Sequence, residues 1–213
     1  MINAILKYPL FYRLYQKTVR TKYSEYDFIQ YIFSKLNTNI RMLDLCCGDS
    51  FILNFVGKYL EDYLGADNNQ NYLDHSKKKW QKFKFLNLDL TERKNLERLR
   101  EFSPNFIFIN GAIHHLNDET VKTIISIILS EFKQSFFLSV DPIHHNNKLI
   151  NSFMLALDRG KHIRNEKQYR ELMEGYKNFI IDDFYKMSFQ NIFHYQNFEL
   201  KQMYLDWKKT LKY

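Results

Sequence analysis

The segment from Arg41 to Val56 constrains the fold of this chain more than any other. Arg41–Leu45 is an apolar strand pattern containing one acid, Cys46–Ser50 is a run of small residues, and Phe51–Val56 is again rich in apolar residues. A strand, a tight turn and a helix account for this order. Gly48 would let a ligand approach the backbone of the turn, and the first amides of the helix would point toward it. The segment therefore predicts a ligand-binding strand–turn–helix unit.

Strand and helix patterns alternate after this unit. Further apolar strands are expected at Tyr63–Ala66, Phe83–Leu88, Phe106–Ile109 and Ser135–Val140. Helices are expected at Phe51–Tyr59, Asn71–Trp80, Arg93–Glu101 and Asp118–Phe132. Apolar strands alternating with helices indicate an α/β protein, in which helices cover both faces of a mostly parallel sheet.

The two ends of the chain have a different pattern. The residues up to Leu36 are rich in aromatic side chains at helical spacing, and Lys148–Leu157 and Glu166–Met173 also favour helices. Two late segments, Phe179–Phe184 and Ile192–Leu205, are expected to be the closing strands of the same sheet. We found no linker or repeat that would divide the 213 residues into two domains.

The composition gives little information about the binding partners of the chain. The net charge of +7 permits an anionic partner, although lysine-rich helix faces are more often simply solvated. No run approaches ~18 apolar residues, so no membrane span is expected. Lys7 and Pro9 interrupt any signal-peptide core, which favours a cytoplasmic location. The two cysteines, Cys46 and Cys47, are adjacent and too close for an ordinary structural disulfide. They are predicted to be reduced thiols or, alternatively, a vicinal redox pair.

Polar residues follow several of the expected strands and should meet at one edge of the sheet. Asp67 comes about 20 residues after the small-residue turn, the spacing at which an acid reaches ribose hydroxyls. Asp89 would accept from an adenine amino group, and the backbone of Asn110 would line the remainder of the ligand. Because the turn lacks a Gly-Lys-Ser/Thr ending, it is not a phosphate cradle, and a nucleoside without phosphates fits better.

The histidines suggest acid–base chemistry. His114 and His115 follow the fourth strand of the core, where an imidazole could act as a general base; alternatively, one packs under the loop and the other faces solvent. Asp141 and His144 leave the next strand on the same side and could line an acceptor pocket. Because adjacent imidazoles rarely ligate one ion together, and no Cys-x-x-Cys spacing occurs, no metal site is expected.

The segment Asp44–Ser50, with the acids that follow it, resembles the class I S-adenosylmethionine-dependent methyltransferases over nearly the whole chain. Cys46 and Ser50 stand where that family customarily has glycines. The resemblance implies a Rossmann-like sheet of seven strands with the last one antiparallel. It also implies that S-adenosylmethionine binds at the positions matching the family's motifs: Asp44, Cys46, Gly48, Asp67, Asn68, Asp89, Leu90 and Asn110.

A narrower resemblance, to a bacterial subgroup of surface-polysaccharide and metabolite pathways, comes from Pro9–Gln16, Gly111–Leu116 and Leu157–Arg164. It implies one methyltransferase domain over residues 1–213, with an N-terminal helical lid (1–38), a cofactor-binding core (39–141) and an acceptor-facing insertion with closing strands (142–213). Four further site residues follow from it: Tyr12 and Gln16 in the lid, and Arg159 and Arg164 facing the acceptor.

The expected function is methyl transfer from S-adenosylmethionine, yielding S-adenosylhomocysteine, to an oxygen of a small-molecule or glycan-linked acceptor. An anionic acceptor would suit the arginines, because guanidinium groups match carboxylates and phosphates. Two alternatives stay open: a nucleic-acid methyltransferase, disfavoured because Asn110–Ile113 lacks the Pro-Pro-aromatic turn, and a non-catalytic scaffold that binds the cofactor. The chain is expected to be a monomer or a homodimer.

Overall fold

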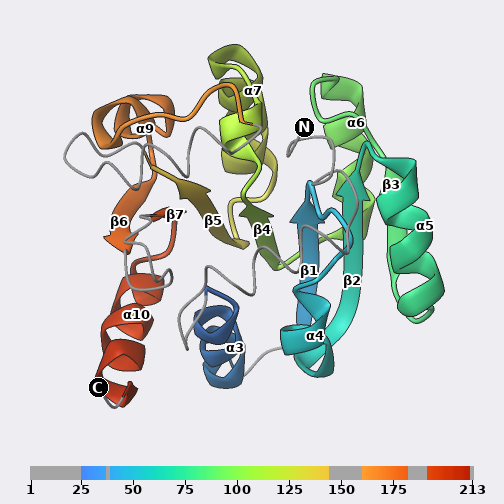
Figure 1. Ribbon diagram of the computed structural model, residues 1–213, viewed down its shortest axis with the longest axis horizontal. Coiled ribbons are helices and arrows are strands. Elements are labelled where there is room, and N and C mark those ends of the chain that lie inside the picture. Colours follow the sequence, from blue (N-terminus) through green and yellow to red (C-terminus); the bar gives the residue numbers. More distant parts are fainter. Residues whose placement is uncertain (1–24, 37–38, 144–159, 182–190, 212–213) are drawn as a thin grey trace, which may run out of the picture.

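The computed structural model describes residues 25–36, 39–143, 160–181 and 191–211 (Figure 1). Several predictions concern residues outside these ranges: the helical pattern before residue 25, the helix Lys148–Leu157, and the candidate site residues Tyr12, Gln16, His144 and Arg159.

One sheet organises the described residues. Its strands lie in the order β3-β2-β1-β4-β5-β7-β6. The neighbouring pairs from β3 to β5 are parallel, whereas β7 is antiparallel to both of its neighbours. The strands are β1 (Ile40–Leu45), β2 (Leu60–Asp67), β3 (Lys84–Asn87), β4 (Phe106–Asn110), β5 (Phe136–Pro142), β6 (Lys177–Ile181) and β7 (Asn191–Tyr195). The predicted α/β, Rossmann-like class with a mostly parallel sheet is confirmed.

Helices pack on both faces of the sheet (Figure 1). One face is covered by α3 (Glu25–Lys35), α4 (Leu53–Val56), α5 (Gln70–Lys79) and α10 (Phe198–Thr210). The other is covered by α6 (Arg93–Arg98), α7 (Asp118–Glu131) and α9 (Glu166–Leu172). The core on the first face is rich in Phe and Tyr, whereas Ile and Leu dominate the core on the second face.

Side-chain caps fix where several helices begin. Asn69 accepts hydrogen bonds from backbone amides of α5, and Asn117 accepts one from Thr120 of α7 at 2.9 Å. Asn165 and Gln168 form a reciprocal capping box at the start of α9. Such caps satisfy amides that have no partner within the helix, typically stabilising it by ~1 kcal/mol.

The prediction of a strand over Ile192–Leu205 was wrong beyond its first residues. Only Asn191–Tyr195 forms a strand, and α10 follows it. Leu200, Met203 and Trp207 recur at intervals of three and four residues, and this spacing places one side of the helix against the aromatic core. Burial of Leu200 and Trp207 there therefore favours a helix over a longer strand.

None of the helices in the described ranges combines the length and apolar character needed to cross a membrane.

Candidate functional site at the carboxyl edge of the sheet

The turn after β1 has an alternating backbone conformation. Cys46, Gly48 and Ser50 all have positive φ, at 57°, 54° and 53°. For the two non-glycine residues this left-handed conformation costs roughly 1–2 kcal/mol each. The turn therefore keeps a glycine-like backbone path even where glycine is absent. A Cβ atom built on Gly48 would meet no described residue within 4 Å, so the described part of the chain leaves open space beside the turn.

Asp67, at the end of β2, holds this turn in place. Its carboxylate accepts hydrogen bonds from the backbone amides of Gly48 and Asn69, each at 2.8 Å. The amide of Cys47 donates to the carbonyl of Ala66 at 3.1 Å. The structure thus brings together Gly48 and Asp67, as the sequence predicted. A carboxylate has about four acceptor positions, so Asp67 keeps capacity for further donors.

Asp44 is a buried acid beneath the same turn. It is 3% exposed, and the hydroxyl of Tyr63 donates to its carboxylate at 2.6 Å. Burial raises the pKa of Asp44 to about 7, with a smaller contribution from the negative charge of Asp67, while the Tyr63 hydrogen bond opposes the shift. Asp44 therefore holds its proton to a much higher pH than an ordinary carboxyl group does.

We expect the Asp44→Asn variant to be more stable than the wild type, by an amount that grows as the pH rises. The native carboxyl holds its proton up to about pH 7, whereas the unfolded chain releases it near pH 4. Native stability is thus lost between those values, by roughly 1.4 kcal/mol per pH unit, and asparagine avoids this loss while still accepting from Tyr63. Urea unfolding from pH 4 to pH 8 should show an advantage that grows with pH and then levels off. An advantage independent of pH would contradict the assignment, and Asp62→Asn is the matched control.

The residues expected around adenine lie at the ends of β2 and β3. Asn68 is exposed beside Asp67, and Leu90 is 5% exposed in the second core. Asp89 is exposed, and its carboxylate accepts hydrogen bonds from the hydroxyl and the amide of Thr91 at 2.7 and 2.9 Å. These bonds lower the pKa of Asp89, which therefore stays ionised as an acceptor.

Asn110, at the end of β4, contacts a residue that no sequence motif indicates. Its side-chain amide donates to the hydroxyl of Tyr26 in α3 at 3.2 Å. The ring of Tyr26 stacks on Phe55, with centroids 4.9 Å apart, and meets Phe51 edge-on at 5.5 Å. In the sequence, Tyr26 looks like one more aromatic residue of an apolar helix face, so nothing local identified it.

The two adjacent histidines have different environments. His114 is 2% exposed, and its Nδ1 lies 2.9 Å from the carboxylate of Asp141, which is 1% exposed. His115 is exposed, and its ring lies 4.2 Å from that of His114. This is the arrangement in which one histidine packs under the loop and the other faces solvent. Burial raises the pKa of Asp141, although the bonds from His114 oppose that shift.

In the part of the chain that the structure describes, Arg164 makes structural contacts, which differs from the acceptor-facing role implied by the resemblance. Arg164 is 5% exposed, and its side chain donates to the backbone carbonyls of Ile113, Leu116 and His162 at 3.2, 2.8 and 2.9 Å. It also pairs with Asp118 at the start of α7. Every described contact of the guanidinium is therefore structural, and it ties residues 160–165 to the turn that carries the histidines.

Gly160 belongs to this clamped segment and lies directly on His114. A Cβ atom at Gly160 would approach Cδ2 of His114 to 2.0 Å, so no side chain fits there. The amide of His162 donates to the carbonyl of His114 at 2.9 Å. His114 is thereby enclosed by Asp141 on one side and by residues 160–162 on the other.

The two cysteines point to opposite faces of the sheet. Cys46 packs against the second core and Cys47 against the first, and both thiols are free. Burial raises the pKa of both thiols well above the ordinary value, so neither forms a reactive thiolate readily. The structure therefore favours two packed thiols over a redox pair. Within the described ranges, His, Cys, Asp and Glu side chains nowhere gather in threes as a metal site.

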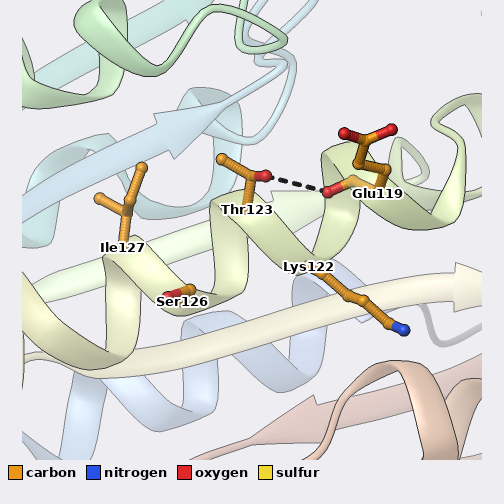
Figure 2. A pocket seen from close by; sticks show the side chains of 5 residues that line it. All are labelled: Glu119, Lys122, Thr123, Ser126 and Ile127. Carbon is orange, nitrogen blue, oxygen red and sulfur yellow. Dashed lines mark hydrogen bonds between the residues drawn. The ribbon is translucent and has the colours of Figure 1, made fainter.

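A hollow on α7 is lined by other residues than those described above. It is lined by Glu119, Lys122, Thr123, Ser126 and Ile127, and Thr123 donates within the helix to the carbonyl of Glu119 at 3.0 Å (Figure 2). The lining comes from one helix and contains none of the predicted site residues. We therefore place the candidate site at the carboxyl edge of the sheet.

Comparisons with known proteins support the fold. No known protein family and no curated protein matches the sequence. Among solved structures, the methyltransferase domain of bacterial CtHen1 is 14% identical with a TM-score of 0.58, over 81% of this chain and 95% of that chain. A TehB-like SAM-dependent methyltransferase from Corynebacterium glutamicum is 13% identical with a TM-score of 0.55, over 81% and 89%.

A SAM-dependent methyltransferase from Archaeoglobus fulgidus is similar to the same extent, with 14% identity and a TM-score of 0.56 over 80% of this chain and 94% of that chain. The likeness extends over nearly all of each of these three chains. At such low identity it establishes a shared Rossmann-like fold.

Proposed function

We propose that this chain is a methyltransferase that uses S-adenosylmethionine and releases S-adenosylhomocysteine. Its acceptor is a small molecule or a glycan-linked group that takes the methyl on oxygen, within a bacterial surface-polysaccharide or metabolite pathway of the cytoplasm. The proposal joins the shared fold to the residues that this chain places at the carboxyl edge of its sheet.

The observation that carries the proposal is the contact between Asp67 and the turn after β1. An acid at the end of β2 that holds the Gly48 amide, and still has acceptor positions, suits the two hydroxyls of a ribose. Asp89 lies at the end of the next strand, where it suits the adenine amino group, with Asn68 and Leu90 beside it. The open space at Gly48 leaves room for the methionine part.

When bound, S-adenosylmethionine supplies an electrophilic methyl group on a sulfonium, and its transfer mainly requires alignment of the acceptor. We assign the deprotonation of the acceptor hydroxyl to His115, because it is the exposed member of the pair. His114, bonded to Asp141, then packs against the ring of His115 and does not itself touch the acceptor. Since Arg164 is committed to structural contacts, an anionic acceptor would rely on other cations, such as Lys161.

Calorimetric titration with S-adenosylmethionine and S-adenosylhomocysteine tests the proposed function. Micromolar binding of both would support it and would justify screening nucleotide-sugars, phosphorylated metabolites and glycans for uptake of a labelled methyl group. Absence of binding would exclude cofactor-dependent methyl transfer by this chain. Binding without methyl uptake by any acceptor, RNA included, would favour the non-catalytic scaffold.

For the base, we expect His115→Ala to lower turnover about tenfold or more while leaving cofactor affinity unchanged, because general-base catalysis acts on the acceptor alone. Methyl uptake would be measured against pH with the acceptor found in the screen. The variant should also lose the decline of the rate at acidic pH. An unchanged rate would exclude His115 as the base, and His75→Ala, another exposed histidine, is the control.

A further inference from the structure

The contact between Tyr26 and Asn110 joins two distant parts of the chain at the edge of the candidate site. Tyr26 lies in the first turn of α3 and is 8% exposed, with its ring packed against Phe51 and Phe55. Both phenylalanines follow the turn after β1. The position of the Tyr26 hydroxyl is therefore set by the same segment that forms the proposed cofactor turn.

This contact orients the carboxamide of Asn110. Its nitrogen donates to the Tyr26 hydroxyl at 3.2 Å, so its oxygen must point away from Tyr26. Among the described residues, no donor reaches that oxygen, and Asn110 is only half-buried. The side-chain oxygen of Asn110 is thus a hydrogen-bond acceptor that points in a fixed direction at the end of β4 and can bind a ligand.

The order of the strands indicates which part of the cofactor would meet this oxygen. In the proposed function, Asp67 and Asp89 take the ribose and the adenine at the ends of β2 and β3. β4 lies on the other side of β1, where Leu45 is in register with Ile109. The methionine part, which extends away from the ribose, therefore reaches toward Asn110. Its charged donor is the α-ammonium group.

We propose that Tyr26 is a positioning residue that fixes the Asn110 carboxamide, whose oxygen accepts a hydrogen bond from the α-ammonium group of the bound cofactor. This inference rests on the proposed function and adds two roles to it. Asn110 contacts the cofactor through its side chain, and α3 contributes to cofactor binding through Tyr26.

Calorimetry on Tyr26→Phe with three ligands tests the inference. S-adenosylmethionine and S-adenosylhomocysteine carry the ammonium group, whereas 5′-methylthioadenosine lacks the whole amino-acid part. We expect Tyr26→Phe to bind the first two about three- to tenfold more weakly, in keeping with one displaced hydrogen bond, and the third as well as the wild type does. Tyr31→Phe is the matched control, because Tyr31 is a half-buried tyrosine of the same helix.

A double-mutant cycle separates positioning from a general loosening of α3. Asn110→Ala should weaken binding of the two ammonium ligands at least as much as Tyr26→Phe does, and adding Tyr26→Phe to it should have no further effect. Additive losses, or an equal loss for 5′-methylthioadenosine, would overturn the inference. If the wild type binds S-adenosylmethionine and Tyr26→Phe binds it equally well, the inference alone fails. If the wild type binds none of the three ligands, the proposed function fails with it.

Discussion

Asp67→Ala is expected to weaken binding of S-adenosylmethionine by about 3 kcal/mol, or more than 100-fold. Two losses combine in this variant. The ribose loses its charged acceptor, and the amides of Gly48 and Asn69 lose the carboxylate that holds the turn. Titration calorimetry on folded protein would measure the change, with S-adenosylhomocysteine as a second ligand.

Asp62→Ala is the matched control for this measurement. Asp62 lies on the same strand but pairs with Lys84 at 3.7 Å, away from the turn. Its removal should leave cofactor affinity within a factor of two or so, since exposed ion pairs contribute about 1 kcal/mol or less even to folding. Equal affinities for the Asp67→Ala variant and the wild type would refute the assignment of the ribose site to Asp67.

Below pH 6.5, His194 is expected to make the folded protein progressively less stable. His194 lies in β7 at 0% exposure, with Nδ1 3.2 Å from the hydroxyl of Ser139. Burial, assisted by the positive charge of Arg170, lowers the pKa of His194 to about 3. The unfolded chain takes up a proton near pH 6.5 and the native protein does not. Stability therefore falls by roughly 1.4 kcal/mol per pH unit from pH 6.5 toward pH 3.

Urea unfolding of wild type and His194→Asn between pH 7 and pH 4.5 would measure this effect. Asparagine keeps a polar partner for Ser139 but does not titrate, so the variant should lose nearly 3 kcal/mol less than the wild type over that range. The comparison must be between the two proteins, because Asp44 acts in the opposite direction over the same pH range. His75→Asn, at an exposed histidine, should behave as the wild type does. Parallel curves for His194→Asn and the wild type would disprove the assignment.

The parallel part of the fold could be predicted because its strands carry their own signal. β1 and β4 are short apolar runs between helical patterns, and a strand buried on both faces requires such a run. The end of the chain was less predictable. Ile192–Leu205 begins as a strand and continues as α10. Its apolar residues alone did not show where strand spacing gives way to helical spacing.

The candidate site likewise contains contacts that the sequence predicts and contacts that it does not. Gly48 and Asp67 could be placed together from the sequence, because the carboxyl ends of neighbouring parallel strands must meet. The contact of Asn110 with Tyr26 joins residues 84 positions apart and depends on how α3 packs on the sheet. Arg164 was assigned to the acceptor from the narrower resemblance, and its burial against three carbonyl groups could not be seen in the sequence.

The clamp formed by Arg164 has a consequence for engineering and for divergence among proteins of this fold. The guanidinium of Arg164, which belongs to residues 160–165, donates to carbonyls of the turn at 113–116. Gly160 packs so closely on His114 that no side chain fits between them. The two segments therefore behave as a single module. A graft that replaced residues 160–165 alone would remove the guanidinium from the carbonyls of the turn, and one that reshaped the turn alone would move those carbonyls away from the buried guanidinium. A transplant of both segments would keep the guanidinium with its partners. Under the proposed function, we expect a change of acceptor specificity to involve both segments together.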